Sequence, residues 1–256
     1  MKKLIRIFTG SLALLLLLCS VVTCGKKNVL IVGTSPDFLP YEYLDETGNI
    51  IGFDIELMLE IGKRIGKRIE FRAMGFNEIL EAVKNREIDA GLSAFTITTQ
   101  RMQEVLFSMP YTTNAQVLVV KSDDFSWYDM YKEQIEEKLK NSIRIGACEN
   151  YVGYFYAESM ILQHESSLQG YPNFTQAISA LNEDEIDVII MDRVVAQKAA
   201  NLPENNIKVI SETLTTENFG IPIAFSNLRL KEQIDKALQD MIEDGFIEAL
   251  TVKWKQ

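Results

Sequence analysis

Residues that build metal centres and disulfide frameworks are scarce in this sequence. Its 256 residues contain one histidine, His164, and three cysteines. Zinc fingers, histidine-rich metal sites and disulfide-stabilised miniproteins all need more of these side chains at close spacing. We therefore expect no metal site and no cofactor.

Positive charge is also in short supply. Lys and Arg total 26 against 36 for Asp and Glu, which gives a formal net charge of -10, and no long basic run follows the first few residues. Because nucleic-acid binding depends on clustered positive charge, a nucleic-acid partner is not expected. The apolar fraction of 47% is typical of a folded globular chain, and the length allows one large domain or two modest ones.

The longest apolar run near the N-terminus, residues 12–18, is too short to span a bilayer. Basic residues precede it, which is the arrangement of an export signal. The segment that follows, residues 21–25, resembles a lipobox, the site at which a bacterial lipoprotein is cleaved and acylated. We expect residues 1–23 to be a signal peptide, Cys24 to be the lipidated N-terminus and residues 24–27 to form a linker. The mature protein would then be extracytoplasmic and anchored to the membrane by lipid, with an ordinary secretory signal as the alternative.

Short β-rich runs alternate with helical runs from Asn28 onward, which indicates an α/β fold. Strands are expected at residues 29–34, 69–73 and 89–94. Helices are expected at residues 53–65 and 78–84, the second with Asn77 as its N-cap. The alternation resumes at residue 143, and residues 228–255 are expected to be mostly helical.

Two segments of the chain share a pattern at an offset of 98 residues. Residues 76–90 and 174–188 have Phe, Ala, Glu, Ile and Asp in register, with a residue of capping type after the Phe. We interpret each segment as a capped helix, a turn and a buried strand that delivers polar residues, Ser93 and Thr96 in the first and Asp192 in the second. Ligands bind at the carboxyl ends of such strands, so two facing copies predict a shared cleft. The alternative is that Glu-Ile-Asp is merely a common turn.

Several motifs together resemble one family, the type II extracytoplasmic solute-binding proteins of polar amino acid ABC importers, or bacterial solute-binding protein family 3. The motifs are Gly-Thr-Ser-Pro at 33–36, Pro-Tyr-Glu at 40–42, Gly-Phe-Asp-Ile-Glu-Leu at 52–57, Ile-Asp-Ala at 88–90, Thr-Ile-Thr at 96–98 with Arg101, and Phe-Ser with Pro-Tyr at 107–111. The resemblance implies two lobes, each a mixed β-sheet flanked by helices, joined by a two-segment hinge. Residues 28–114 with 219–256 would form lobe 1, and residues 115–218 lobe 2.

The resemblance also implies a function without catalysis. It implies a monomer that captures a free L-amino acid between the lobes and delivers it to the permease subunits of an ABC importer. Two other functions stay open. One is a ligand-binding sensor module for a separate receptor. The other, less favoured, is an enzyme similar to cyclohexadienyl dehydratase, which would need a general acid and a general base, and the sequence places no second carboxylate beside Asp192.

Charged and hydroxyl-bearing site residues follow from the resemblance one by one. Arg101 aligns with the arginine that grips the ligand α-carboxylate, and the planar guanidinium suits that group. Thr96 aligns with the residue whose backbone N–H and hydroxyl meet the same carboxylate. Ser93 and Asp192 align with the groups that receive the α-ammonium.

The walls of the site are implied by the same alignment. Phe38 aligns with an aromatic residue that stacks on the ligand side chain, and Phe76 with an apolar residue opposite it. In lobe 2 the chain departs from the usual Gly-Thr pair, and the backbone N–H groups of Tyr151 and Val152 are expected to meet the carboxylate at a helix N-terminus. Cys148 is a further pocket candidate, with an inert buried thiol as the alternative.

The residue at position 35 bears on the ligand side chain. Relatives that bind basic amino acids commonly carry an aspartate there, whereas this chain has Ser35. Burying a cation without a partner is costly, so we expect a neutral or polar L-amino acid rather than a basic one. A basic ligand remains open, because Asp37, Glu42 or Glu149 could supply the missing carboxylate.

Overall fold

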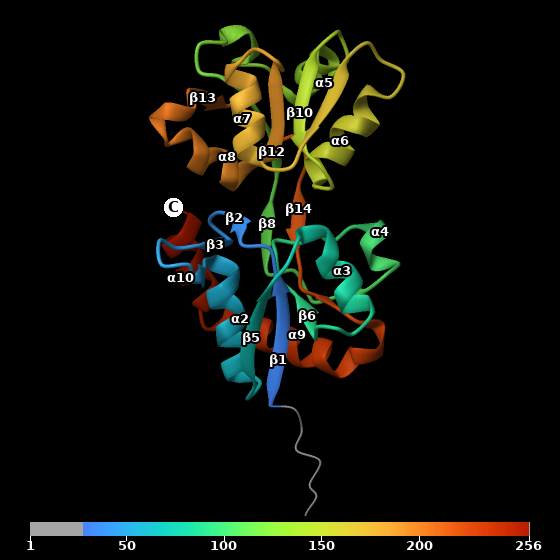
Figure 1. The fold of residues 1–256 in the computed structure, drawn as a ribbon, viewed down its shortest axis with the longest axis vertical. Coiled ribbons are helices and arrows are strands. Elements are labelled where there is room, and N and C mark those ends of the chain that lie inside the picture. Colours follow the sequence, from blue (N-terminus) through green and yellow to red (C-terminus); the bar gives the residue numbers. More distant parts are fainter. Residues whose placement is uncertain (1–27, 256) are drawn as a thin grey trace, which may run out of the picture.

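The computed structural model describes residues 28–255, which form two lobes stacked along the long axis of the molecule (Figure 1). The predicted signal peptide, Cys24 and the linker lie outside the described residues. Each lobe contains a five-stranded sheet with helices packed on it. The predicted two-lobed α/β fold is therefore confirmed. Among residues 28–255 no helix combines the length and apolar character needed to cross a membrane.

The sheet of lobe 1 is mostly assembled from the N-terminal part of the chain. Its strand order is β5(Arg68–Ala73), β1(Val29–Thr34), β6(Ala90–Gly91), β15(Pro222–Ile223), β7(Leu106–Phe107). Strand β1 is parallel to β5 and β6, and β15 is antiparallel to β6 and β7. Successive residues of β1 pack into different hydrophobic cores. Val32 packs into the core formed with α2(Phe53–Arg64) and α9(Leu228–Glu243), and Ile31 packs against the core formed with α3(Phe76–Lys84). The other elements are β2(Asp37–Phe38), β3(Glu42–Leu44), β4(Ile50–Ile51), α4(Thr99–Met102), the 3-10 helix Phe225–Asn227 and α10(Phe246–Lys255).

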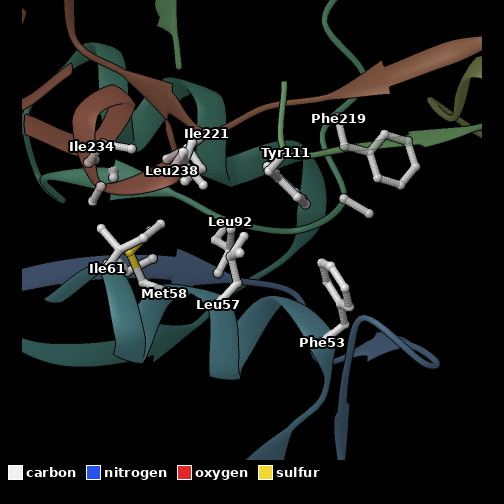
Figure 2. Close-up of a cluster of buried hydrophobic side chains, with 14 of the residues drawn as sticks. Phe53, Leu57, Met58, Ile61, Leu92, Tyr111, Phe219, Ile221, Ile234 and Leu238 are labelled. Carbon is white, nitrogen blue, oxygen red and sulfur yellow. The ribbon is translucent and has the colours of Figure 1, made fainter. Parts of the chain in front are cut away.

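The predicted amphipathic helix forms α2 and supplies much of the core of lobe 1. Phe53, Leu57, Met58 and Ile61 are all fully buried, and their spacing puts them on one side of the helix. Figure 2 shows this row facing residues of α9, with Leu92 and Ile221 between the two helices. Burying each such side chain stabilises the fold by about 1.5–3 kcal/mol. The apolar periodicity thus fixes how α2 docks on the sheet.

The sheet of lobe 2 has the same plan. Its strand order is β11(Ser167–Tyr171), β10(Arg144–Cys148), β12(Val188–Asp192), β9(Gln116–Lys121), β13(Ile207–Val209). Strand β10 is parallel to β11 and β12, while β9 is antiparallel to β12 and β13. The helices are α5(Lys132–Leu139), α6(Val152–Ile161), α7(Phe174–Asn182) and α8(Arg193–Ala200), with 3-10 turns at Phe125–Trp127 and Pro203–Asn205. In both sheets the second strand is therefore parallel to the first and the third, and the fourth strand is antiparallel to the third.

The repeat predicted at an offset of 98 residues is confirmed. Helix α3 with β6, and α7 with β12, occupy the same place in their sheets. The turns between them place Arg86 and Asp184 in the left-handed region, at φ 63° and 61°. In lobe 1 the carboxylate of Asp89 accepts the backbone N–H of β1 residue Ile31 at 2.8 Å. In lobe 2 Asp187 accepts the N–H of β10 residue Arg144 at 2.8 Å, so Glu-Ile-Asp ties two strands together and is more than a turn.

The predicted helix caps of the repeat are wrong by two residues. Helix α3 begins at Phe76 rather than Glu78, and the N–H of Gly75 donates to the Glu78 carboxylate at 3.0 Å. In the second copy the side chain of Asn173 accepts the N–H of Gln176 at 3.0 Å. The capping residue therefore precedes the shared Phe, which is the first residue of both helices.

Two strands carry the chain between the lobes. Strand β8(Thr112–Asn114) pairs antiparallel with β14(Glu217–Phe219), with Glu217 opposite Asn114. Figure 1 shows both segments running from one lobe to the other. We propose that the boundaries lie here, with residues 28–114 and 219–256 as lobe 1 and residues 115–218 as lobe 2.

Candidate ligand-binding site

A cavity of about 10 Å³, which has room for about one water molecule, lies between the lobes. Eight of the nine predicted binding residues line it, together with Ala94. From lobe 1 come Phe38, Phe76, Ser93, Thr96 and Arg101, and from lobe 2 come Tyr151, Val152 and Asp192. Ser93 and Thr96 follow β6, Arg101 lies in α4, and Asp192 is the last residue of β12. The carboxyl ends of the two repeat strands therefore face one cavity.

Cys148 is the predicted residue that the structure leaves out of this cavity. It lies at the end of β10 with 1% of its surface exposed, and no disulfide engages it. Burial raises the pKa of its thiol well above the usual range. The alternative of an inert buried thiol therefore fits the structure better than a pocket role.

The guanidinium of Arg101 is held by the loop that precedes α4 and by two aromatic rings. One guanidinium N–H donates to the carbonyl of Thr96 at 2.9 Å, and the group lies 5.3 Å and 5.5 Å from the ring centroids of Phe95 and Phe76. Burial lowers the pKa of Arg101 to about 10, while the charges of Glu217 and Asp192 oppose that shift. The side chain therefore remains a cation at neutral pH. A guanidinium has five N–H donors, so several are left to face an anion.

Asp192 supplies a carboxyl group from lobe 2. It is 4% exposed, and its Oδ1 accepts hydrogen bonds from the amides of Gln116, at 3.1 Å, and Asn114. Burial, and secondly the charge of Glu217, raise the pKa of Asp192 strongly. Two amide donors thus only partly offset the cost of a buried carboxylate. A cation placed in the cavity would favour the ionised form.

Glu217 is a buried carboxylate that the sequence reasoning missed. It stands on the hinge strand β14 and accepts the hydroxyl of Thr96 at 3.0 Å and that of Thr215 at 2.7 Å. The Thr96 hydroxyl proton consequently points at Glu217, and its lone pairs are left for the cavity. This differs from the expectation that the hydroxyl meets a carboxylate, because an acceptor suits an ammonium. The only signal in the sequence was the position of Glu217 beside the predicted crossing.

The hydroxyl of Ser93, like that of Thr96, donates to a buried carboxylate. Its hydroxyl donates to Oε1 of the fully buried Glu42 at 2.9 Å and accepts the N–H of Ser35 at 3.2 Å. Burial, followed by the charge of Asp54, raises the pKa of Glu42 well above its usual range. Glu42 thus lies behind Ser93. Neither it nor Asp37 or Glu149 lines the cavity, so the structure places no carboxylate from that trio against a ligand side chain.

A wider groove of about 340 Å³ lies beside the cavity. It shares Phe76, Arg101 and Val152 with the cavity and is otherwise lined by Asn77, Leu80, Thr98, Gln100, Glu104, Asn150 and Phe155. Helices α3, α4 and α6 therefore flank a path toward Arg101. Within residues 28–255 no cluster of His, Cys, Asp and Glu is arranged to hold a metal ion.

Two lobes on a pair of hinge strands, with a guanidinium from one and a carboxyl group from the other lining a cavity between them, define a two-lobed solute-binding protein. The model of the bacterial extracellular solute-binding proteins, family 3, matches residues 30–256, and the chain belongs to this family. This confirms the resemblance seen in the motifs.

Similar proteins include the arginine-binding extracellular protein ArtP of Bacillus subtilis, 29% identical over 231 residues that cover 90% of this chain and 87% of the relative. The probable histidine-binding protein of Neisseria gonorrhoeae is 26% identical and covered to 81%, over 87% of this chain. Among solved structures, an ancestral arginine-binding protein bound to arginine superposes with a TM-score of 0.80 at 30% identity, covering 90% of this chain and 99% of that one. The ancestral amino acid-binding protein AncCDT-1, a precursor of cyclohexadienyl dehydratase, gives 0.81 at 26%, covering 90% and 97%.

Proposed function

We propose that this protein captures a free L-amino acid between its lobes and delivers it to the permease subunits of an ABC importer. One observation carries the proposal: Arg101 from lobe 1 and Asp192 from lobe 2 line the same small cavity. An α-amino acid carries an anion and a cation on adjacent atoms, and these two side chains complement both. Relatives named for arginine, histidine and cystine binding support an amino acid as the class of ligand.

The hydroxyl groups set the orientation of this ligand. An ammonium has three N–H donors, and the cavity offers three acceptors in the Asp192 carboxylate and the oxygens of Ser93 and Thr96. The carboxylate then faces the free donors of Arg101. It also faces the start of α6, where the helix dipole favours an anion near Val152.

We infer a neutral or polar ligand side chain rather than a basic one. Ser35 hydrogen-bonds to Asp37 at 3.2 Å, and neither residue lines the cavity. Asp192 lines the cavity and is assigned to the α-ammonium, whereas Glu217 and Glu42 do not line it and are bonded to the hydroxyls of Thr96 and Ser93. A second cationic group on the ligand would therefore find no second carboxylate in the lining of the cavity.

Binding without catalysis is the function that the placement of Glu217 supports. A dehydratase needs a proton donor and acceptor within hydrogen-bond reach of the substrate. Glu217 is the second carboxylate near Asp192, but it does not line the cavity and is engaged by Thr96 and Thr215. The arrangement holds a zwitterion and leaves no paired acid and base facing it.

The location of the protein follows from its N-terminus. We propose that Cys24 is acylated, so that lipid holds the mature protein on the outer side of the membrane as a monomer. The linker to the first described residue, Asn28, is then residues 24–27, and a segment this short keeps the lobes close to the membrane surface, where a permease would receive the ligand.

A thermal-shift screen of the twenty L-amino acids with ornithine and cystine tests the function. Ligand at 100 times its Kd stabilises the fold by about 2.7 kcal/mol, which for a chain of this size raises Tm by about 5–10 °C. Small-angle scattering with the best ligand should show a smaller radius of gyration, since that ligand contacts both lobes. No shift with any amino acid would refute the proposed function, and a large shift confined to arginine, lysine and ornithine would overturn the inference of a neutral side chain.

A further inference from the structure

The ring of Tyr151 lies between aromatic side chains of the other lobe. Tyr151 belongs to lobe 2, and its ring stacks on Phe76 of lobe 1 with centroids 4.9 Å apart and an interplanar angle of 18°. On another side it lies 5.6 Å from the ring of Phe38. Phe76 continues the stack onto Phe95, at 4.6 Å and 16°. Phe38 and Phe76 are the two walls assigned above to a ligand side chain.

A further ring, from lobe 2 itself, also contacts Tyr151. Phe174, the first residue of α7, lies 5.7 Å from Tyr151 in an edge-on arrangement and 6.0 Å from Phe38. All three contacts of Tyr151 fall in the 4.5–7 Å range in which aromatic pairs attract beyond their buried area. The space between the aromatic walls is therefore filled by a side chain of the protein itself.

The backbone that carries this ring is a constrained turn. Tyr151 is the N-cap residue of α6 in an extended conformation, and Asn150 before it has a φ of 67°, in the left-handed region that asparagine tolerates. Burial raises the pKa of the Tyr151 phenol far above neutral pH, so the group is uncharged. The ring is thus a neutral apolar body held on a short, constrained turn.

We propose that Tyr151 is a specificity-determining residue that restricts the site to L-amino acids with small side chains, such as glycine, alanine and serine. This inference rests on the proposed function. The cavity of about 10 Å³ is lined by the Tyr151 ring together with Arg101, Asp192 and the hydroxyl-bearing Ser93 and Thr96, the groups assigned above to the part common to all amino acids. A large side chain directed between Phe38 and Phe76 must displace the Tyr151 ring and lose its three ring contacts.

The test compares ligand size with the size of residue 151. Isothermal titration calorimetry measures glycine, L-alanine and L-serine against L-glutamine, L-phenylalanine and L-arginine, for the wild type, Tyr151→Phe and Tyr151→Thr. The wild type and Tyr151→Phe, which keeps the ring, should bind the small ligands at least ten times more tightly than the large ones. Tyr151→Thr should bind at least one large ligand ten times more tightly than the wild type does.

The outcomes separate this inference from the function beneath it. Tighter binding of a large amino acid by the wild type overturns the size restriction and leaves amino-acid capture standing. The size restriction is likewise overturned if Tyr151→Thr gains no affinity for large ligands. Failure of every amino acid with all three proteins refutes the proposed function and the inference with it. Should circular dichroism show Tyr151→Thr unfolded, the ranking of ligands by the wild type and Tyr151→Phe decides the question.

Discussion

Replacing Arg101 by alanine should abolish most of the affinity for amino acids. The guanidinium spends one donor on the Thr96 carbonyl and lies against two phenylalanine rings, so water screens it poorly. Truncating one partner of a buried charged pair costs about 2–5 kcal/mol, which corresponds to about 30-fold to several thousand-fold in Kd. We expect Arg101→Ala in the upper half of this range because the rings shield the pair.

Arg101→Lys separates charge from geometry. Lysine keeps the positive charge but loses the planar fork that engages both carboxylate oxygens, so it should recover only part of the affinity. The matched control is Arg64→Ala, because Arg64 also lies over a ring, 5.8 Å from the centroid of Phe246, but outside the cavity. Its Kd should stay within about threefold of the wild type, as independent distant sites do.

Calorimetric titration with the best ligand from the thermal-shift screen measures the Kd of each variant directly. A loss below about tenfold for Arg101→Ala, or a loss equal to that of Arg64→Ala, would show that Arg101 does not hold the ligand carboxylate. Circular dichroism of each variant checks that the fold is retained.

Three further predictions concern other parts of the molecule. Burial and the charge of Glu217 raise the pKa of Asp192, so this carboxyl keeps its proton at low pH and must lose it to bind an ammonium. Ligand affinity should therefore rise with pH from about 5 toward 8. Glu217→Gln should flatten this pH dependence in titrations, and a flat wild-type profile would contradict the argument. Gly153→Ala places a methyl carbon 2.7 Å from a buried side-chain oxygen and should destabilise the fold by about 1–3 kcal/mol in urea unfolding. Gly75→Ala, with no atom closer than 3.5 Å, should cost under about 0.5 kcal/mol, and equal losses would refute the packing argument. Cys24→Ser should remove fatty-acid labelling of the protein in growing cells, and undiminished labelling would show that Cys24 is not the anchor.

Local patterns were enough to predict the elements and their class. The apolar run at residues 29–34 forms β1 with those bounds, and the predicted helix at 53–65 forms α2, one residue shorter. The repeat placed Asp89 and Asp187 at equivalent positions of the two copies. These predictions succeeded because the periodicity of burial along a strand or helix is written in consecutive residues.

The caps show where the same reasoning ends. Asn77 has the chemistry of an N-cap, yet α3 begins before it, because Glu78 satisfies the N–H of Gly75 and Phe76 already has helical geometry. The free energies of two helices that begin at neighbouring N-cap residues differ by about 1 kcal/mol. Tertiary packing of a phenylalanine outweighs that amount easily.

What the sequence by itself determined was the α/β class, the repeated unit and, through the family resemblance, eight residues that line the cavity. Only the tertiary structure decided what surrounds them. Thr96 and Glu217 are 121 residues apart, and their hydrogen bond turns the hydroxyl proton away from the cavity. Tyr151 reaches Phe38 and Phe76 only because a hinge brings one lobe against the other. Such contacts depend on the closure of distant segments in space, and no pattern in neighbouring residues encodes the direction of a ring or a proton.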